Sequence, residues 1–203
     1  MRVWREAAGL FKAPVDLPGR QLDADFIARK QPGKLTFGSG SSSSRVAGEL
    51  LQQMTKIQLV HVPYKGNPQV VIDLLADRVT MMMGDPLTSP AHIRSGKLRA
   101  IGVTSMSRMT LLPEVPTIDE AGVKGFEISS WYGVYTAAGT PPAVVARLNG
   151  IMHRAARSHV VQALFRATGL EIFLGTPGQL AQHQKEETAK WGRIIKAASI
   201  EPE

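Results

Sequence analysis

The stretch KLTFGSGSSSSRVAGELLQQM, residues 34–54, joins an apolar run, a loop of glycine and serine, and an amphipathic segment. The apolar run at 34–37 predicts a short strand, because such runs bounded by glycine and serine are typical of strands. Residues 45–54 predict a helix whose apolar side chains recur at the spacing of one face. Those side chains are Val46, Leu50, Leu51 and Met54. The stretch therefore predicts a strand, a loop and a helix in succession.

The same unit recurs as far as residue 103. Apolar runs at 57–62, 79–83 and 98–103 predict three further strands, with amphipathic segments between them. Asn67 and Pro68 are typical of a helix start, with Asn67 as the cap and Pro68 in the first turn. Strands that alternate with helices imply parallel pairing and an α/β fold. We expect the first strand and the two that follow it to share one sheet.

The two ends of the chain have different patterns. Residues 1–33 are expected to be irregular, apart from a short helix near Leu22 and Phe26. Beyond residue 125 we expect an extended stretch at 126–138, helices that begin near 141, 160 and 177, and a strand at 170–174.

The composition is that of a globular protein and excludes several kinds of site. The 203 residues are 43% hydrophobic and include no cysteine, so disulfides, thiolate metal sites and a cysteine nucleophile are excluded. The five histidines show no ligand spacing with carboxylates, and we expect no metal and no cofactor. The net charge of +7 comes from scattered basic residues, which favours attraction of small anions and argues against nucleic acid. No apolar run has the length of a membrane span, and the first residues do not resemble a signal peptide.

Three loops follow the predicted parallel strands at their carboxyl ends, where open α/β sheets bind ligands. The loop at 39–44 contains only glycine and serine and precedes a helix, so amides, hydroxyls and the helix dipole favour a carboxylate or phosphate there. The next two loops add a phenol, an ammonium group and a carboxylate that could bind an ammonium or hydroxyl group of a ligand. The candidate ligand-binding residues are Ser39, Gly40, Ser41, Ser42, Ser43, Ser44, Tyr64, Lys65, Gly66 and Asp85.

Each of these candidates also has a purely structural interpretation. The serines could form a flexible linker, Lys65 could be a solvated lysine, and Asp85 could cap the next helix. Trp131 and Tyr132 lie in the extended stretch, where packing in the core or at a hinge explains them as well as ligand contact does.

Motifs of nucleotide-binding and hydrolytic enzymes are incomplete. The sequence at 38–43 lacks the third glycine of a dinucleotide-binding fingerprint, and both Gly-Lys pairs precede leucine, which excludes a P-loop. The serine cluster lacks the G-x-S-x-G elbow. We therefore expect no catalytic residue and no enzyme activity. A serine hydrolase would require a Ser–His arrangement in space that the sequence does not reveal.

Seven short motifs together resemble a known family. They are KLTFG at 34–38, SSS at 42–44 with AGEL at 47–50, VPYKG at 62–66, SGKLRA at 95–100, VPT at 115–117, AGTP at 138–141 and WG at 191–192. Their order and spacing resemble the substrate-binding proteins of tripartite tricarboxylate transporters, the Bug or TctC family.

The resemblance implies a two-lobed periplasmic binding protein of the Venus-flytrap type. Such a protein holds a small organic carboxylate, or an amino-acid-like relative, between its lobes and delivers it to membrane permease subunits. The resemblance assigns the ligand carboxylate to the loop at 39–44. It makes residues 34–124 an α/β ligand-binding lobe, and residues 125–203 the crossover strand and C-terminal helices of a partial second lobe.

Family chains are longer and carry a complete first lobe at the N-terminus, so we expect this chain to be N-terminally truncated. An incomplete lobe predicts weak ligand binding and dimerisation through exposed apolar surface. A ligand-sensing module of the same architecture is the alternative function, and a serine hydrolase is the third.

Overall fold

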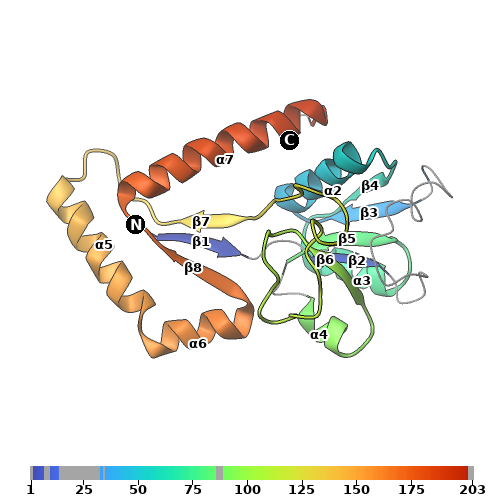
Figure 1. Cartoon of the computed structure of the whole chain (residues 1–203), viewed down its shortest axis with the longest axis horizontal. Coiled ribbons are helices and arrows are strands. Elements are labelled where there is room, and N and C mark those ends of the chain that lie inside the picture. The colour runs from blue at the N-terminus through green and yellow to red at the C-terminus, as the bar shows by residue number, and fades with distance from the viewer. Residues whose placement is uncertain (1, 7–9, 14–32, 34, 86–88, 201–203) are drawn as a thin grey trace.

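The computed structural model describes residues 2–6, 10–13, 33, 35–85 and 89–200, which contain two β-sheets (Figure 1). The strands are β1 (Arg2–Glu6), β2 (Leu10–Ala13), β3 (Thr36–Ser39), β4 (Val60–Pro63), β5 (Met81–Gly84), β6 (Arg99–Val103), β7 (Trp131–Gly133) and β8 (Leu170–Leu174). The described helices are α2 (Ser42–Thr55), α3 (Asn67–Leu75), α4 (Pro90–Arg94), α5 (Pro142–Ala156), α6 (His159–Thr168) and α7 (Pro177–Ala197). Figure 1 shows the sheet β4-β3-β5-β2-β6 at one end, the sheet β7-β1-β8 with α5 and α6 at the other, and α7 running between the two ends.

The parallel part of the five-stranded sheet confirms the expected α/β fold. Strand β3 pairs in parallel with β4 on one side and with β5 on the other, so the three predicted strands share one sheet. All four residues of β5 are buried, as expected for a strand covered on both faces. The carboxyl ends of these strands meet at one edge, which brings the loops after them together.

The expectation that residues 1–33 are irregular is wrong at residues 10–13, which form strand β2. Residues 10–13 pair antiparallel with both β5 and β6 and so occupy an interior position of the five-stranded sheet. The strand predicted at 98–103 is present as β6, but β2 separates it from β5. The short helix expected near Leu22 and Phe26 lies outside the described residues.

The three-stranded sheet is antiparallel and centred on β1. Residues 2–6 pair with β7 on one side and with β8 on the other, so they form a second strand that the sequence analysis missed. The strand predicted at 170–174 is confirmed as β8. Of the extended stretch expected at 126–138, only Trp131–Gly133 is a strand.

Helix α2 begins three residues earlier than expected because Ser41 caps it. Ser41 Oγ accepts a hydrogen bond from the Ser44 amide at 3.3 Å, and Ser44 Oγ accepts one from the Ser41 amide at 3.1 Å. This reciprocal pair is a capping box. Ser42, Ser43 and Ser44 therefore form the first turn of a helix and are not part of a loop.

The largest cluster of buried apolar side chains lies between the five-stranded sheet, α2 and the end of α7. Phe37, Met81 and Phe126 are fully buried there. Helix α7 joins this core through Ile194, and the Gln53 side chain of α2 donates to the Ile194 carbonyl at 3.2 Å. Helix α7 is thus anchored to the five-stranded sheet, although it begins beside the three-stranded one (Figure 1).

Helices α5 and α6 leave apolar side chains in water. Val144, Leu148 and Ile151 recur on one face of α5 and are 45, 42 and 42% exposed. Val160 and Leu164 of α6 are 77 and 57% exposed, and no described residue of α6 is buried. We call these five side chains the exposed apolar face. Apolar faces of this kind are normally covered by another element or by a partner.

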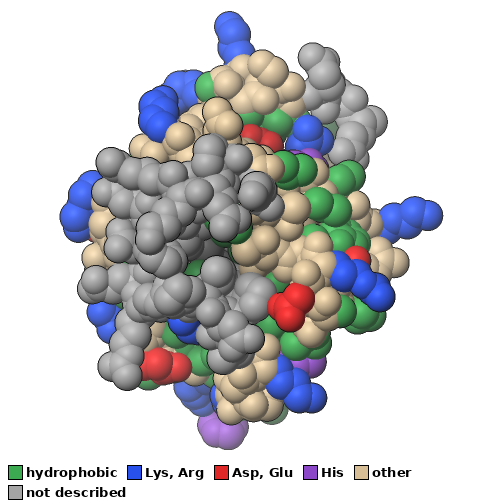
Figure 2. All heavy atoms as spheres, turned by 90° about the vertical axis from the view of Figure 1, so that its right-hand side faces the viewer, with side chains coloured by type: hydrophobic (Ala, Val, Ile, Leu, Met, Phe, Trp, Pro, Cys, Tyr) green, Lys and Arg blue, Asp and Glu red, His purple; other side chains and the backbone are tan. Residues whose placement is uncertain are grey.

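Basic side chains are dispersed over the face that Figure 2 shows. The Lys and Arg side chains there stand apart around the rim and do not form a continuous patch. This arrangement matches the scattered basic residues of the sequence.

Candidate functional site

The predicted ligand-binding residues divide between two cavities, and Ser41 lines both of them. The smaller cavity, of about 190 Å³, contains Ser41, Ser43, Ser44 and Asp85 from the predicted set. The larger cavity, of about 620 Å³, contains Ser39, Gly40, Ser41, Ser42, Tyr64 and Lys65. Gly66 lines neither of these two cavities.

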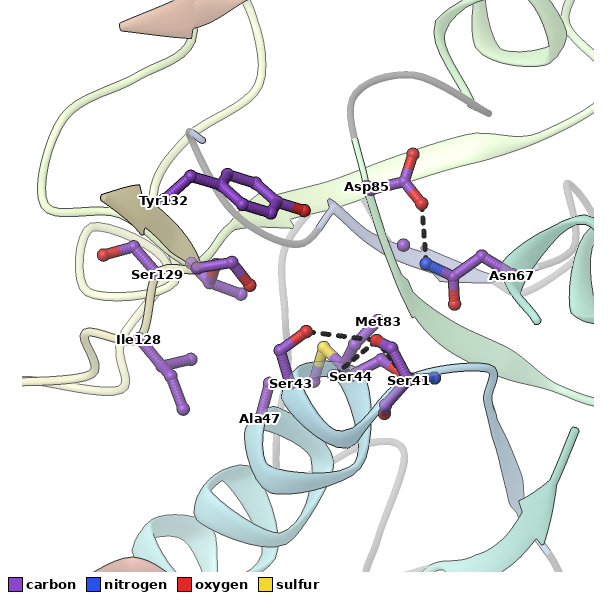
Figure 3. A pocket seen from close by; sticks show the side chains of 13 residues that line it. Ser41, Ser43, Ser44, Ala47, Asn67, Met83, Asp85, Ile128, Ser129 and Tyr132 are labelled. Carbon is purple, nitrogen blue, oxygen red and sulfur yellow. Dashed lines mark hydrogen bonds between the residues drawn. The ribbon is translucent and has the colours of Figure 1, made fainter. Parts of the chain in front are cut away.

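The start of α2 forms one wall of the smaller cavity (Figure 3). Ser41 Oγ and Ser43 Oγ are hydrogen-bonded at 3.1 Å, and Ser44 Oγ donates to the Ser41 carbonyl at 2.8 Å. The amides of Ser42 and Ser43 belong to the first turn and so have no acceptor within the helix. Together with the positive end of the helix dipole, these amides favour a carboxylate at this wall.

A second wall of the smaller cavity is formed by Asn67 and Asp85. Asn67 Nδ2 donates to Asp85 Oδ2 at 2.6 Å. The sequence predicts Asn67 as the cap of α3, but the cap residue is Gly66, and no side chain caps this helix. The Asn67 side chain is therefore available to contact the loop after β5.

Residues 128–132 form the wall across from this amide–carboxylate pair (Figure 3). The Ile128 amide donates to the Thr104 carbonyl at 3.0 Å, which ties the segment to the end of β6. Ser129 is 3% exposed, whereas Tyr132 is 58% exposed. This wall is therefore buried at one end and open to water at the other.

A chain of polar and charged groups holds that wall against α7. Ser129 Oγ donates to Glu127 at 3.1 Å, and Glu127 accepts a hydrogen bond from Lys190 Nζ at 2.8 Å. Lys190 Nζ also lies 2.7 Å from Glu187, whose other oxygen accepts from the Trp191 indole N–H at 3.0 Å. Glu187 is 7% exposed, so one lysine pairs with two carboxylates in a largely buried position.

Replacing this lysine is expected to destabilise the protein. Lys190→Met retains most of the side-chain length but leaves Glu127 and Glu187 close together without a cation, which should cost about 1.5–3 kcal/mol. Urea denaturation of the two proteins measures the difference in the free energy of unfolding. Lys185→Met is the matched control, because Lys185 is an exposed lysine of the same helix. An equal loss in both variants would contradict the bridging role of Lys190.

The larger cavity contains a hydrogen-bonded serine–histidine pair. Ser39 Oγ and His61 Nε2 are hydrogen-bonded at 2.6 Å, so the structure brings together a Ser–His pair that the sequence left open. A serine hydrolase also requires a group that orients the imidazole and donors for the oxyanion. The pair alone therefore does not indicate hydrolysis.

Tyr64 is hydrogen-bonded to α3 and does not line the smaller cavity. Its hydroxyl donates to Asp73 Oδ2 at 2.8 Å. Burial and this hydrogen bond raise the pKa of Tyr64, and the same hydrogen bond, followed by one from Arg78, lowers the pKa of Asp73. The neighbouring Lys65 is exposed and lines only the larger of the two cavities.

The loop before α2 packs directly against the backbone at the start of α3. A Cβ atom on Gly40 would lie 2.2 Å from the Gly66 carbonyl carbon and 2.2 Å from the Asn67 amide nitrogen. Only glycine at position 40 permits this approach of the loop before α2 to the start of α3. The approach fixes where Asn67 stands relative to the serines.

The smaller cavity has no cationic side chain among the described residues that line it. In the described part of the chain, no three His, Asp or Glu side chains cluster closely enough to hold a metal ion. An anion in the smaller cavity would therefore depend on amide and hydroxyl donors.

None of the helices described is both long enough and apolar enough to cross a membrane.

Five of the nine polar residues that line the smaller cavity were missing from the residues predicted from the sequence. The missed residues are Asn67, Thr104, Ser129, Ser130 and Tyr132. Asn67 did carry a signal, because it directly follows a candidate loop, but its preference for helix caps offered a simpler explanation. Ser129 and Ser130 belong to a segment far downstream, and no local pattern links them to the three loops.

Comparisons with known proteins identify a family and its relatives. A family model described as "Tripartite tricarboxylate transporter family receptor" matches residues 3–200. The UPF0065 protein in the tcbD–tcbE intergenic region of Pseudomonas sp. strain P51 is 43% identical over 172 residues, which are 83% of this chain and 51% of that protein. The chain spans 51–58% of the length of six curated relatives and 92% of a seventh.

Solved structures share the fold. Rpa4515 of R. palustris, solved with adipate, superposes with a TM-score of 0.87 at 30% identity and covers 100% of this chain and 69% of that one. The periplasmic binding protein BugD gives a TM-score of 0.83 at 27% identity, over 100% of this chain and 69% of its own. MatC of Rhodopseudomonas palustris, with bound malate, gives a TM-score of 0.77 at 27% identity, over 96% of this chain and 68% of its own. These likenesses confirm the expected α/β fold of the periplasmic-binding-protein type, of which the chain spans a part.

Proposed function

The chain belongs to the tripartite tricarboxylate transporter receptor family, as its motifs predict, and on this premise we propose that it is a solute-binding protein for a small organic carboxylate. The observation that carries the proposal is the smaller cavity, where the first turn of α2 offers amides and serine hydroxyls. Donors of this kind bind a carboxylate through charge-assisted hydrogen bonds. The adipate of Rpa4515 and the malate of MatC are carboxylates and support the same ligand class.

The proposed setting is the periplasm, and the proposed partner is a membrane permease. The description of the family as a transporter receptor and the periplasmic binding protein BugD support both. In this role the protein captures and releases its ligand without changing it.

The volume of the smaller cavity fits a ligand of a few carbon atoms. Its volume of about 190 Å³ equals that of roughly six water molecules in the liquid. Tyr132 leaves one side of it in contact with water, where charge-assisted hydrogen bonds are weaker. We therefore expect the 203-residue chain to bind with a dissociation constant in the millimolar range, about −4 kcal/mol.

Ser43→Ala is expected to weaken carboxylate binding about tenfold or more, because one charge-assisted hydrogen bond is worth about 1.5–3 kcal/mol. The substitution removes the hydroxyl that lines the smaller cavity and leaves the backbone amide in place. NMR titration of the labelled chain with succinate measures affinities in this range. Ser42→Ala is the matched control, since Ser42 is exposed and lines only the larger of the two cavities. Unchanged affinity in Ser43→Ala would remove this serine from the site.

A further inference from the structure

The larger cavity differs from the smaller one in the charge of its walls. The described residues that line the larger cavity include two cations, Arg45 and Lys65, and no Asp or Glu. The described lining of the smaller cavity has the opposite composition, with the carboxylate of Asp85 and no cation. Attraction of an anion by full positive charges therefore acts in the larger cavity, whereas the smaller one relies on amides and hydroxyls.

The polar groups of the larger cavity are within reach of a ligand. Lys65 is exposed, and no described residue forms an ion pair or hydrogen bond with it. Ser42 is exposed too, and its first-turn amide has no acceptor within α2. Glu49, one turn along α2 from Arg45, attracts the Arg45 guanidinium but does not line the cavity. A carboxylate could therefore contact the ammonium group, the hydroxyl and the amide together.

Apolar side chains form the rest of the larger cavity. Ile195 and Ile200 come from the end of α7, where the Ile200 amide donates to the Ile195 carbonyl at 3.1 Å, and Pro63 comes from β4. Both isoleucines are half-buried and pack on the main core cluster. A small inorganic ion would leave these side chains and most of the volume of about 620 Å³ in contact with water. An anion with an apolar body would cover them, which is favourable.

We propose that the larger cavity is a second ligand site, which takes an organic anion with a bulky apolar body. Lys65, Arg45 and Ser42 bind the anionic group, and the isoleucines at the end of α7 contact the apolar body. The proposal goes beyond the function proposed above and does not depend on it, because the two cavities share only Ser41 among their described lining residues.

Three probes separate the charge from the apolar body. Cyclohexanecarboxylate carries both, cyclohexylmethanol has the body without the charge, and acetate has the charge without the body. NMR titrations of the labelled chain at pH 7 give the dissociation constants and the amides that respond. We expect cyclohexanecarboxylate to bind about fivefold or more tighter than either other probe, with the largest shifts at Lys65 and Ile200. Equal binding by the alcohol or by acetate would overturn the proposal, as would absence of binding or shifts confined to the smaller cavity.

A pair of variants assigns the anion to this cavity. Lys65→Glu reverses the charge at its wall and is expected to weaken binding of cyclohexanecarboxylate about tenfold. Lys97→Glu changes the net charge equally at an exposed lysine that lines neither of the two cavities, and it should bind like the wild type. Equal losses in both variants, or no loss in a folded Lys65→Glu protein, would overturn the proposal.

Titration of the same variants with succinate distinguishes the two sites. Binding of succinate in the smaller cavity should change by less than about twofold in both variants, because neither lysine lines that cavity. Failure of the second site therefore leaves the carboxylate site measurable, and failure of the carboxylate site leaves the second site measurable. Circular dichroism establishes folding, and the three probes test the wild-type chain independently of any variant.

Discussion

Gly40→Ala is expected to lower the melting temperature of the chain by about 6–12 °C and to abolish carboxylate binding. The added methyl group would stand 2.2 Å from backbone atoms of Gly66 and Asn67, which cannot rotate away as the end of a side chain can. Overpacking of this kind costs about 3 kcal/mol, and each kcal/mol shifts the melting temperature of a chain of this size by about 2–4 °C. Because Gly40 directly precedes Ser41, the cap of α2, the serines and amides of the first turn are displaced from the wall of the smaller cavity. Stability and binding are therefore expected to fall together.

Gly192→Ala is the matched control for this substitution. Gly192 lies within α7, and a Cβ atom there would meet no atom within 4 Å. Alanine should stabilise the helix at that position by about 0.5–1 kcal/mol. Thermal melts followed by circular dichroism and titrations with succinate compare both variants with the wild type. A Gly40→Ala protein that melts and binds like the wild type would show that the two backbone segments are farther apart in solution.

The second large effect concerns the exposed apolar face, through which the chain is expected to self-associate. Even partial burial of a Val, Leu or Ile side chain contributes about 1 kcal/mol, and five such side chains are exposed on α5 and α6. Residues 142–168 also contain four arginines and no acidic residue, so two copies of this face repel each other. Because salt screens charges and leaves apolar contacts in place, association should increase with ionic strength.

Sedimentation velocity at low and high salt measures this association. The double variant Leu148→Gln with Leu164→Gln removes two of the exposed apolar side chains and should shift the chain toward the monomer. Ile72→Gln is the matched control, because Ile72 is a 63% exposed apolar residue of α3. A wild-type chain that stays monomeric at high protein concentration and high salt would contradict the prediction.

Helices and parallel strands could be predicted because their signals are local. The α3 segment has a proline in its first turn and buries Val70, Val71 and Leu74, which recur on one face. Strand β5 is an uninterrupted apolar run. In contrast, β1 and β2 are short and carry charged residues, and they become strands by pairing with segments far along the chain. Such tertiary pairing leaves no periodic pattern in the strand itself.

The site could be predicted in kind but not in detail. Four consecutive serines are equally good helix caps, so the sequence cannot indicate that Ser41 caps α2 and that Ser43 lines the smaller cavity. Tyr64 follows one of the predicted strands, but its ring packs over Gly38, which has no Cβ atom, and its hydroxyl donates to Asp73. The position of Tyr64 thus depends on packing between neighbouring elements.

The positions of β1 and β2 determine the order in which this protein can fold. Both strands precede their partners in the sequence, yet β1 lies between β7 and β8, and β2 lies between β5 and β6. Strand β1 pairs with β8 at Leu170–Leu174, so the three-stranded sheet cannot be completed until that distant segment has been synthesised. Closing such long loops before any contact forms slows folding. Strand β1 therefore stays unpaired while the residues between it and its partners are synthesised, and its exposed edge is open to aggregation during that time.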